Sequence, residues 1–253
     1  MRTILITGAS TGIGAAAARR FAAGGDHVAV HYSSNMSAAE EVLASLSGDG
    51  HSLVQGDLSV PGTAEAMVHT VVTGHGQVDV LVNNAGSAPS AANRHRIGEV
   101  SQELWTSTFR RMVDVNLLGA AELTFCVADH LIKRAAPGAI VNVGSRGAFR
   151  GEPDYPAYAA SKAGLHALGQ SLAVALAPYE ISVTSVAPGF IASARQADKL
   201  AGDAGPSIRE QSPFGRVGTP EEVAAAIVWL ASPEAIWSSG AILDANGASY
   251  LHT

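Results

Sequence analysis

A tyrosine and a lysine stand four residues apart in the segment 155-YPAYAASKAGL-165, at Tyr158 and Lys162. Residues spaced i and i+4 share one face of a helix, and Pro156 favours a helix start just before them. A free tyrosine has a pKa of about 10, and a nearby ammonium lowers this value because it favours the phenolate. The pair could therefore act as a general acid or base near neutral pH, although a surface Tyr–Lys pair is also common.

Two further polar residues point to the same kind of site. Ser145 follows the strand-like run 139-AIVNVG-144, and 82-VNNAG-86 ends another such run. Both would lie at the carboxyl edge of a sheet, where open α/β folds bind ligands. Asn116 lies inside a long predicted helix, where asparagine is a poor helix former, so we expect it to have a polar task such as holding a water.

The elements that must position these residues alternate along the chain. Short runs rich in β-branched residues predict strands at 3–7, 28–32, 53–57, 78–84, 139–144, 181–188 and 241–244. Segments with helical spacing lie between them, at 14–24, 36–46, 63–72, 101–135, 156–177 and 219–231. This alternation predicts a Rossmann-like α/β fold, with a doubly wound sheet of about seven parallel strands flanked by helices. Since no linker or repeat interrupts the pattern, we expect a single domain over residues 1–253.

A glycine-rich loop, 7-TGASTGIG-14, follows the first predicted strand and opens the first helix. Glycines at positions 8, 12 and 14 allow a tight turn, close approach of the backbone to a diphosphate, and close packing of helix on strand. The helix N-terminus then offers free N–H groups and a partial positive charge. The loop therefore predicts a dinucleotide site.

The residues after the second and third strands bear on which dinucleotide binds. The segment 31-HYSSN-35 has no carboxylate to bind the ribose 2′-OH of NAD, while Ser33, Ser34 and Asn35 could donate to a 2′-phosphate. This favours NADP(H) over NAD(H), although no arginine is present and Thr11 stands where a basic residue would strengthen the prediction. Asp57 is either a turn cap or an acceptor for the adenine amino group.

Composition narrows the classes of function. The chain has 253 residues, of which 47% are apolar and 15% charged, and its net charge is −6. Such a chain can bury a large core, and its acidic balance argues against a nucleic-acid partner. The single cysteine, Cys126, excludes an internal disulfide and is interpreted as a small buried residue. His27 and His31 lack a nearby carboxylate ligand, so we interpret them as surface or packing residues and predict no metal site.

The N-terminal residues 2-RTILITG-8 already read as a strand and turn, so we expect no signal peptide. No apolar run reads as long enough to span a bilayer. We therefore expect a soluble, cytoplasmic protein with a small-molecule substrate and no membrane partner.

Taken together, these motifs resemble the short-chain dehydrogenase/reductase family, in its compact single-domain branch. The resemblance covers essentially the whole chain and rests on 7-TGASTGIG-14, Asp57, 83-NNAG-86, Asn116, Ser145, 158-YAASK-162 and 188-PG-189. The segments 30-VHYSSN-35 and 240-GAILDANG-247 resemble members of the β-ketoacyl-carrier-protein reductase type, and many other ketoreductases and sugar dehydrogenases share them.

The resemblance implies a role for each matching residue. Tyr158 would donate the proton in carbonyl reduction and accept it in alcohol oxidation, while Lys162 would lower its pKa and bind the nicotinamide ribose. Ser145 would hydrogen-bond the substrate oxygen, and Asn116 would hold a water that relays protons from Lys162. The implied cofactor-binding residues are Gly8, Ser10, Thr11, Gly12, Ile13, Gly14, Tyr32, Ser33, Ser34, Asp57, Leu58, Asn84, Ala85, Gly86, Tyr158, Lys162, Pro188, Gly189, Ile191 and Ser193.

Some features depart from the family pattern or extend it. Gly144 and Arg146 flank Ser145 at positions where small or aliphatic residues are commoner, and Ser193 replaces a frequent threonine. Segment 190–217 resembles the family's substrate lid, and the helices at 101–135 and 156–177 would form a homotetramer. The loop 87–99 carries Arg94, His95 and Arg96, which could meet an anionic substrate or carrier or could simply be solvated.

These observations predict an NADP(H)-dependent oxidoreductase that reduces a ketone, with a 3-oxoacyl thioester as one candidate substrate. An NAD-dependent alcohol or sugar dehydrogenase of the same family is the alternative, and cofactor preference separates the two. A dinucleotide sensor without turnover is a third reading, which the presence of both Tyr158 and Lys162 disfavours.

Overall fold

The fold is built on a parallel sheet, as a computed structural model that describes residues 1–193 and 196–251 shows. Within those residues the sheet has seven strands in the order β3-β2-β1-β4-β5-β6-β7, and every neighbouring pair is parallel. The predicted fold class is confirmed. The strands are β1 Thr3–Ile6, β2 His27–Tyr32, β3 Ser52–Gln55, β4 Val80–Asn83, β5 Gly138–Val143, β6 Ile181–Pro188 and β7 Ile242–Ala245.

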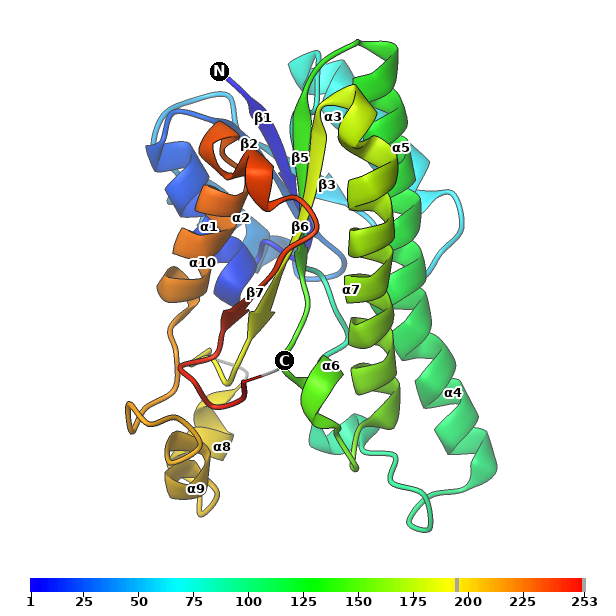
Figure 1. The fold of residues 1–253 in the computed structure, drawn as a ribbon, viewed down its shortest axis with the longest axis vertical. Helices are drawn as coiled ribbons and strands as arrows, with labels where there is room; N and C mark the ends of the chain where they lie inside the picture. The colour runs from blue at the N-terminus through cyan, green and yellow to red at the C-terminus, as the bar shows by residue number, and fades with distance from the viewer. Residues whose placement is uncertain (194–195, 252–253) are drawn as a thin grey trace.

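Helices cover both faces of this sheet (Figure 1). One face packs against α1 (Gly12–Ala23), α2 (Met36–Ala44) and α10 (Pro220–Leu230), and the other against α3 (Thr63–His75), α5 (Gly119–Lys133) and α7 (Pro156–Leu176). Side chains alternate between the faces of a strand, so each strand contributes to two cores. The continuous apolar runs in the sequence arise because helices cover both faces of the central strands, whereas the edge strands β3 and β7 are partly exposed.

The helix predicted at 101–135 is in fact three segments. These are α4 (Gln102–Val113), the π-helical turn η2 (Asp114–Leu118) and α5. The whole run Gln102–Lys133 is long and apolar enough to cross a membrane by length and composition, contrary to our reading of the sequence, and 44% of its apolar window is buried inside the protein. Core helices of soluble proteins pass the same test. On α5, Cys126 is half-buried, and burial raises the pKa of its thiol.

Short helical segments occupy the remaining connections. They are η1 (Ala91–Asn93), α6 (Gly147–Arg150), η3 (Ala177–Tyr179), α8 (Ala197–Ala201), α9 (Gly205–Arg209) and η5 (Pro233–Ser238). Helices α6, α8 and α9 lie beyond the carboxyl ends of the strands (Figure 1). The segment 190–217, expected to act as a lid, contains α8 and α9, and its residues 194 and 195 lie outside the described part of the chain.

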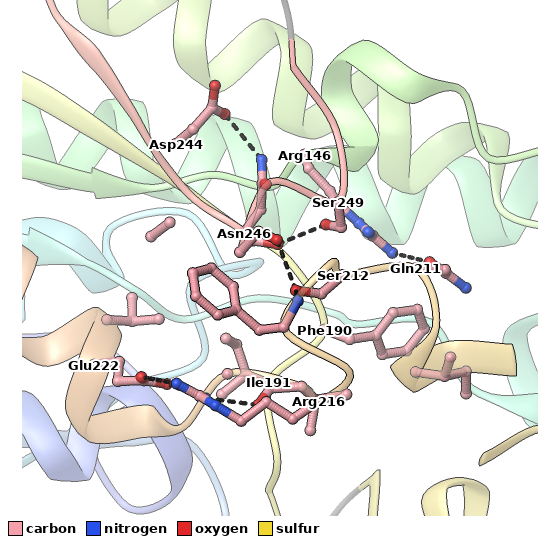
Figure 2. Close-up of a pocket in the computed structure, with 17 residues that line it drawn as sticks. Arg146, Phe190, Ile191, Gln211, Ser212, Arg216, Glu222, Asp244, Asn246 and Ser249 are labelled. Carbon is pink, nitrogen blue, oxygen red and sulfur yellow. Dashed lines mark hydrogen bonds and ion pairs between the residues drawn. The ribbon is translucent and has the colours of Figure 1, made fainter. Parts of the chain in front are cut away.

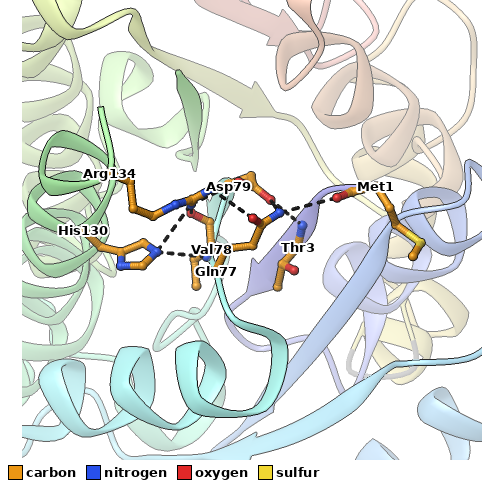
Figure 3. Close-up of polar contacts among 7 residues, drawn as sticks. All are labelled: Met1, Thr3, Gln77, Val78, Asp79, His130 and Arg134. Atoms are coloured by element: carbon orange, nitrogen blue, oxygen red, sulfur yellow. Dashed lines mark hydrogen bonds and ion pairs between the residues drawn. The ribbon is translucent and has the colours of Figure 1, made fainter. Parts of the chain in front are cut away.

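The amino edge of the sheet is closed by a polar cluster (Figure 3). Asp79, just before β4, accepts hydrogen bonds from the Thr3 backbone N–H at 2.8 Å and from Gln77 Nε2 at 2.7 Å. Arg134, just after α5, donates to Asp79 Oδ1 at 3.2 Å and to Gln77 Oε1 at 3.0 Å. His130 Nε2 accepts from the Val78 backbone N–H at 3.3 Å. These contacts tie the starts of β1 and β4 to the end of α5.

Candidate active site

The carboxyl edge of the sheet, in contrast, opens into a pocket of about 690 Å³. Twenty-two residue positions were singled out from the sequence as catalytic or cofactor-binding, and all of them except Gly14 and Asn116 line this pocket. The residues brought together there are Gly8, Ser10, Thr11, Gly12, Ile13, Tyr32, Ser33, Ser34, Asp57, Leu58, Asn84, Ala85, Gly86, Ser145, Tyr158, Lys162, Pro188, Gly189, Ile191 and Ser193.

The glycine loop forms one end of the pocket. Gly8 has φ +61°, and a Cβ there would lie 2.9 Å from the Ala85 Cα, so the loop passes close to the end of β4. Gly14 lies beneath the loop, where a Cβ would meet Asn84 Nδ2 at 2.5 Å. That amide donates to the carbonyls of Thr7 at 2.8 Å and Gly8 at 3.0 Å. Gly14 therefore allows close packing, while the N-terminal turn of α1 contains no acidic residue that would repel a phosphate.

His31 fixes the loop from the side, a role that sequence reasoning missed. It is 2% exposed, which agrees with the packing alternative of the sequence interpretation and excludes the surface one. Its Nδ1 accepts from the Gly8 backbone N–H at 2.9 Å, and its Nε2 donates to the Gly56 carbonyl at 2.9 Å. Burial lowers the pKa of the imidazole, which fits this neutral tautomer. In residues 1–193 and 196–251, no cluster of His, Cys, Asp and Glu is arranged to bind a metal ion.

The turns after β2 and β3 line the far end of the pocket. Ser33 and Ser34 are exposed there, and Asn35 uses its side-chain oxygen to cap α2 through the Ala38 backbone N–H at 3.1 Å. Asp57 Oδ1 accepts from the backbone N–H and hydroxyl of Ser59, at 2.9 and 2.7 Å, and these bonds lower the pKa of the Asp57 carboxyl. Asp57 thus caps the turn through Oδ1, as one of the two sequence interpretations predicted. Asp57 also lines the pocket, so the other interpretation remains open.

Lys162 and Tyr158 lie one turn apart near the start of α7, as their spacing predicts. The Lys162 side chain is 4% exposed, and its Nζ donates to the Val143 carbonyl at the end of β5 at 2.7 Å. Burial lowers the pKa of Lys162 to about 8, so the group is mostly an ammonium at neutral pH. Tyr158 is half-buried and faces the same pocket. A cation one helical turn away on the same face favours the phenolate form of a tyrosine.

Ser145 is presented by the turn that follows β5. Its hydroxyl accepts from the Gly147 backbone N–H at 3.0 Å. A Cβ at Gly144 would lie 2.1 Å from the His166 ring, so only glycine fits before the serine. The backbone N–H of the next residue, Arg146, donates to the Pro188 carbonyl at 3.1 Å, which joins the ends of β5 and β6. The glycine before Ser145 is thus required by the close packing of the β5 end against His166 of α7.

Asn116 lies behind the pocket wall, inside the π-helical turn. It is 1% exposed; its Oδ1 accepts from the Ser87 backbone N–H at 2.7 Å and its Nδ2 donates to Ser161 Oγ at 3.0 Å. A Cβ at Gly86 would lie 3.2 Å from Asn116 Oδ1 and 3.5 Å from Lys162 Nζ, so both side chains meet beside that glycine. π-Helical turns recur at functional sites, and this one joins the end of β4 to α7.

The loop 87–99 begins at the pocket, which Ser87, Ala88 and Pro89 line, but its basic part is fastened to the start of α7 and is not among the lining residues. His95 is fully buried; its Nδ1 donates to the Asn93 carbonyl at 2.7 Å and its Nε2 accepts from the Ala157 backbone N–H at 3.1 Å. Arg94 pairs with Glu99 at 2.8 Å and with Asp154 at 3.1 Å, and Arg96 reaches Asp154 at 3.4 Å. These cations therefore have carboxylate partners within the chain, which differs from the anion-binding reading of the sequence.

Several pocket residues carried no motif. They are Arg111 from α4, Arg146, Glu152 and Tyr155 between β5 and α7, and Phe190, Gln196 and Lys199 from the segment after β6. Arg111 Nη2 lies 3.6 Å from Asp57 Oδ2, so a guanidinium cation from α4 approaches the turn after β3. Among these residues, Arg146 alone was marked in the sequence, by its unusual position next to Ser145. The other residues reach the pocket through tertiary packing, which the sequence does not show.

Comparisons with known proteins agree with this geometry. A family model described as Enoyl-(Acyl carrier protein) reductase matches residues 8–247. The chain is 36% identical to a 3beta-hydroxysteroid dehydrogenase of Eggerthella lenta, covering 99% of this chain and 94% of the relative. It is 37% identical to an L-rhamnose 1-dehydrogenase (NAD(P)(+)) of a Sphingomonas species, covering 99% of this chain and 97% of the relative.

A solved structure extends the comparison. The 3-ketoacyl-(acyl-carrier-protein) reductase of Brucella melitensis, complexed with NADH, superposes with a TM-score of 0.87 at 30% identity, covering 99% of this chain and 98% of that one. The fold, the placement of the sequence motifs and these relatives lead to one assignment. The chain belongs to the short-chain dehydrogenase/reductase family and is an oxidoreductase of the kind that uses a nicotinamide dinucleotide on small-molecule substrates.

Proposed function

We propose that the protein is an NADP(H)-dependent reductase that converts a ketone to an alcohol. The observation that carries the proposal is the meeting of Ser145, Tyr158 and Lys162 with the glycine loop around one pocket of about 690 Å³. These residues come from three separate places in the fold, the β1–α1 loop, the turn after β5 and helix α7, and their convergence has no evident role in stability. A pocket of this kind with convergent polar groups is a default site for catalysis.

Each side chain has a task in this reaction. The Ser145 hydroxyl and the Tyr158 phenol bind the substrate oxygen and hold the carbonyl carbon facing the cofactor site. The nicotinamide supplies the hydride when the cofactor is bound. Tyr158 transfers its proton to the oxygen as negative charge develops there. The Lys162 ammonium stabilises the phenolate that remains, and Asn116, which also abuts Gly86, holds the water through which the proton is replaced.

The proposed preference for NADP(H) rests on the turn after β2. Ser33 and Ser34 line the pocket there, and no carboxylate follows the strand to repel a 2′-phosphate. Asp57 and Leu58 line the pocket at the adjacent turn and would hold the adenine. Gly8 to Ile13 would bind the diphosphate, and Pro188, Gly189, Ile191 and Ser193 would contact the nicotinamide.

The alternative activity is oxidation of an alcohol or sugar with NAD. The likeness to a relative named L-rhamnose 1-dehydrogenase (NAD(P)(+)) supports it. The same residues serve both directions, because Tyr158 would then accept the proton that it otherwise donates. The ratio of kcat/KM with NADPH to that with NADH separates the two proposals.

We also propose that residues 190–217 close over the substrate and that the protein forms a homotetramer in the cytoplasm. Large apolar side chains are exposed on the helices expected to pair, with Phe125 at 72%, Leu118 at 49% and Val174 at 80% exposed. Apolar surface of this kind on neighbouring helices is typical of a subunit interface. Light scattering on the purified protein tests this, and a monomeric mass would contradict it.

The activity is tested by following NADPH and NADH consumption with β-ketoacyl thioesters, cyclic ketones, α-diketones and keto sugars, each paired with the corresponding alcohol and oxidised cofactor. Faster turnover of a ketone with NADPH than with NADH supports the proposal and identifies the substrate type. Equal kcat/KM with the two cofactors would refute the NADP(H) preference. Turnover of the alcohols alone would favour the alternative.

A further inference from the structure

A buried guanidinium lies directly beside the proposed catalytic serine. Arg146 is 4% exposed, follows Ser145 in the chain, and lines the 690 Å³ pocket. It also lines a second pocket, of about 290 Å³, between the end of β7 and the segment that contains α9. Phe190 and Ile191 are the other residues common to both pockets. Arg146 therefore stands on the wall that separates the reaction site from this neighbouring space (Figure 2).

The partners of Arg146 are neutral. Its Nη2 donates to Gln211 Oε1, and its guanidinium lies 5.3 Å from the centre of the Phe190 ring. Arg150 Nη1 donates to the same Gln211 oxygen at 2.8 Å. Two guanidinium groups thus converge on one amide oxygen, which cannot neutralise either charge. Lys199, whose Nζ lies 5.2 Å from the centre of the same Phe190 ring, brings a third cation to the lining of the larger pocket.

Arg146 is distinguished from the other described arginines by its burial. Within the described residues it is the one arginine that is buried, and it forms no ion pair. Arg150 and the more exposed Arg19, Arg20, Arg110 and Arg209 form none either, whereas a carboxylate lies within ion-pair distance of Arg2, Arg94, Arg96, Arg111, Arg134 and Arg216. Glu222 and Asp244 line the smaller pocket, but Glu222 binds Arg216 and Asn246 donates to Asp244. Glu152 lines the larger pocket and attracts Arg146 electrostatically, but the two side chains do not form an ion pair.

A buried cation without a counter-ion is costly, because the interior does not replace its hydration. Burial and the nearby charge of Arg150 both lower the pKa of Arg146, while the charge of Glu152 raises it. An anion placed here would remove this cost and would be held strongly, since hydrogen bonds between charged groups in a dry site are the strong ones.

We propose that Arg146, assisted by Arg150 and Lys199, binds an oxyanion carried by the substrate, a carboxylate or a phosphate. The substrate class is then a keto acid or keto phosphate whose carbonyl lies at Ser145 while its anionic group reaches Arg146. This inference rests on the proposed reductase function. Gln211 Oε1 occupies the anion's place in the free enzyme and yields it when substrate binds, which links substrate charge to the segment 196–217.

The test compares matched pairs of keto acids and their methyl esters, and keto phosphates with the corresponding keto alcohols. For the wild type we expect kcat/KM to be about 10 to 100 times higher for the anion than for its neutral partner. In Arg146→Met this ratio should fall to about 1, mainly through a higher KM for the anion. Whether acids or phosphates are preferred identifies the oxyanion.

Three further variants separate charge from packing. Arg146→Lys keeps a cation and should retain part of the preference, and Arg150→Met should reduce it less than Arg146→Met does. Arg19→Gln removes an exposed guanidinium from α1, far from the pocket, and should leave the ratio unchanged. A wild type that prefers the neutral partners, or a preference unaffected in Arg146→Met, would overturn the proposal while Tyr158-dependent turnover still supported a ketone reductase.

A binding measurement distinguishes failure of the anion site from failure of the reductase proposal. Calorimetric titration of the NADP⁺-saturated protein with inorganic phosphate and with acetate should show weaker binding in Arg146→Met than in the wild type. Loss of binding in the variant, without turnover of any ketone, would support the anion site and refute the reductase. Absence of binding in the wild type would refute the anion site.

Discussion

The two edges of the parallel sheet use buried charge in opposite ways. At the amino edge, Asp79, Arg134 and Gln77 satisfy one another and the backbone around them (Figure 3). At the carboxyl edge, the buried Lys162 ammonium donates to the Val143 carbonyl, and the Arg146 guanidinium donates to the neutral amide of Gln211. The charges at the first edge are paired within the chain, and we propose that those at the second bind the cofactor and the substrate. On this proposal, stability and chemistry come from opposite edges of the sheet.

Removing the charge at Lys162 should produce the largest effect of the variants that probe this difference. In Lys162→Met we expect kcat/KM for ketone reduction to fall by about 10³-fold, because Tyr158 loses the cation that stabilises its phenolate. Steady-state assays with the best ketone measure this. The free energy of unfolding should not fall, since a buried ammonium is replaced by an apolar side chain of similar length.

The pH dependence of stability sharpens the same prediction. The pKa of Lys162 is about 8 in the folded chain against 10.5 for an ordinary lysine, so the unfolded chain binds more protons between these values. The cost of burying the charge is therefore full below about pH 8 and disappears as pH rises toward 10.5. The stability gained in Lys162→Met should be greater at pH 7 than at pH 10, by up to roughly 3 kcal/mol. An identical gain at both pH values would contradict the burial account.

At the amino edge the opposite outcome is expected. Asp79→Ala removes the carboxylate that neutralises Arg134 and the acceptor of the Thr3 N–H, which should lower the free energy of unfolding by about 3 kcal/mol and the melting temperature by roughly 6 to 12 °C. Turnover at 25 °C should stay within about twofold of the wild type, because the pocket lies at the other edge. The control is Asp129→Ala, which removes the exposed ion pair between Asp129 and Lys133 on α5, the helix that ends just before Arg134. Equal melting temperatures for the two variants would contradict a structural role for the cluster.

A smaller effect is expected from a carboxylate placed after β2. Ser34→Asp should repel a 2′-phosphate and accept the ribose hydroxyl of NAD, lowering the NADPH-to-NADH ratio of kcat/KM by about tenfold. Ser47→Asp, exposed and away from the pocket, should leave the ratio unchanged. No change in Ser34→Asp would mean that the cofactor's 2′ position lies elsewhere.

The smallest effect is expected in the loop 87–99. Arg94→Ala with Arg96→Ala removes exposed pairs to Glu99 and Asp154, so the melting temperature should change by no more than about 2 °C. KM for a phosphopantetheine thioester should stay the same, in contrast to the response of anionic substrates to Arg146→Met. A several-fold rise in KM would restore the anion-binding interpretation of this loop.

The parts of this account that were predictable from sequence are those with a local pattern. Runs such as 139-AIVNVG-144 lie within one or two residues of the observed strands, because consecutive apolar residues are what a sheet covered on both faces requires. The glycine loop and the Tyr158–Lys162 spacing predicted residues that line one pocket at the carboxyl edge of the sheet, and these residues do line it. Local spacing determines the face and the end of an element on which a side chain lies.

Other features depend on contacts that leave no local pattern. The π-helical turn at Asp114–Leu118 was not predicted, because a single turn of this kind has no repeating spacing of its own and coincides with tertiary contacts of Asn116 to Ser87 and Ser161. His31 and His95 appear in the sequence as scattered histidines, yet each accepts a backbone N–H distant in the chain. The position of Arg146, buried without a carboxylate partner among the described residues, likewise emerges only when the segment after β6 packs against the turn after β5.

The most direct test of the central claim is the Tyr158→Phe variant, assayed with the best ketone and titrated with NADPH by fluorescence. We predict that kcat falls by about 10³-fold, since the proton donor is removed, while the Kd for NADPH changes by less than about threefold because the ring remains. A variant that binds NADPH normally and turns over at the wild-type rate would contradict the assignment of Tyr158 as the proton donor.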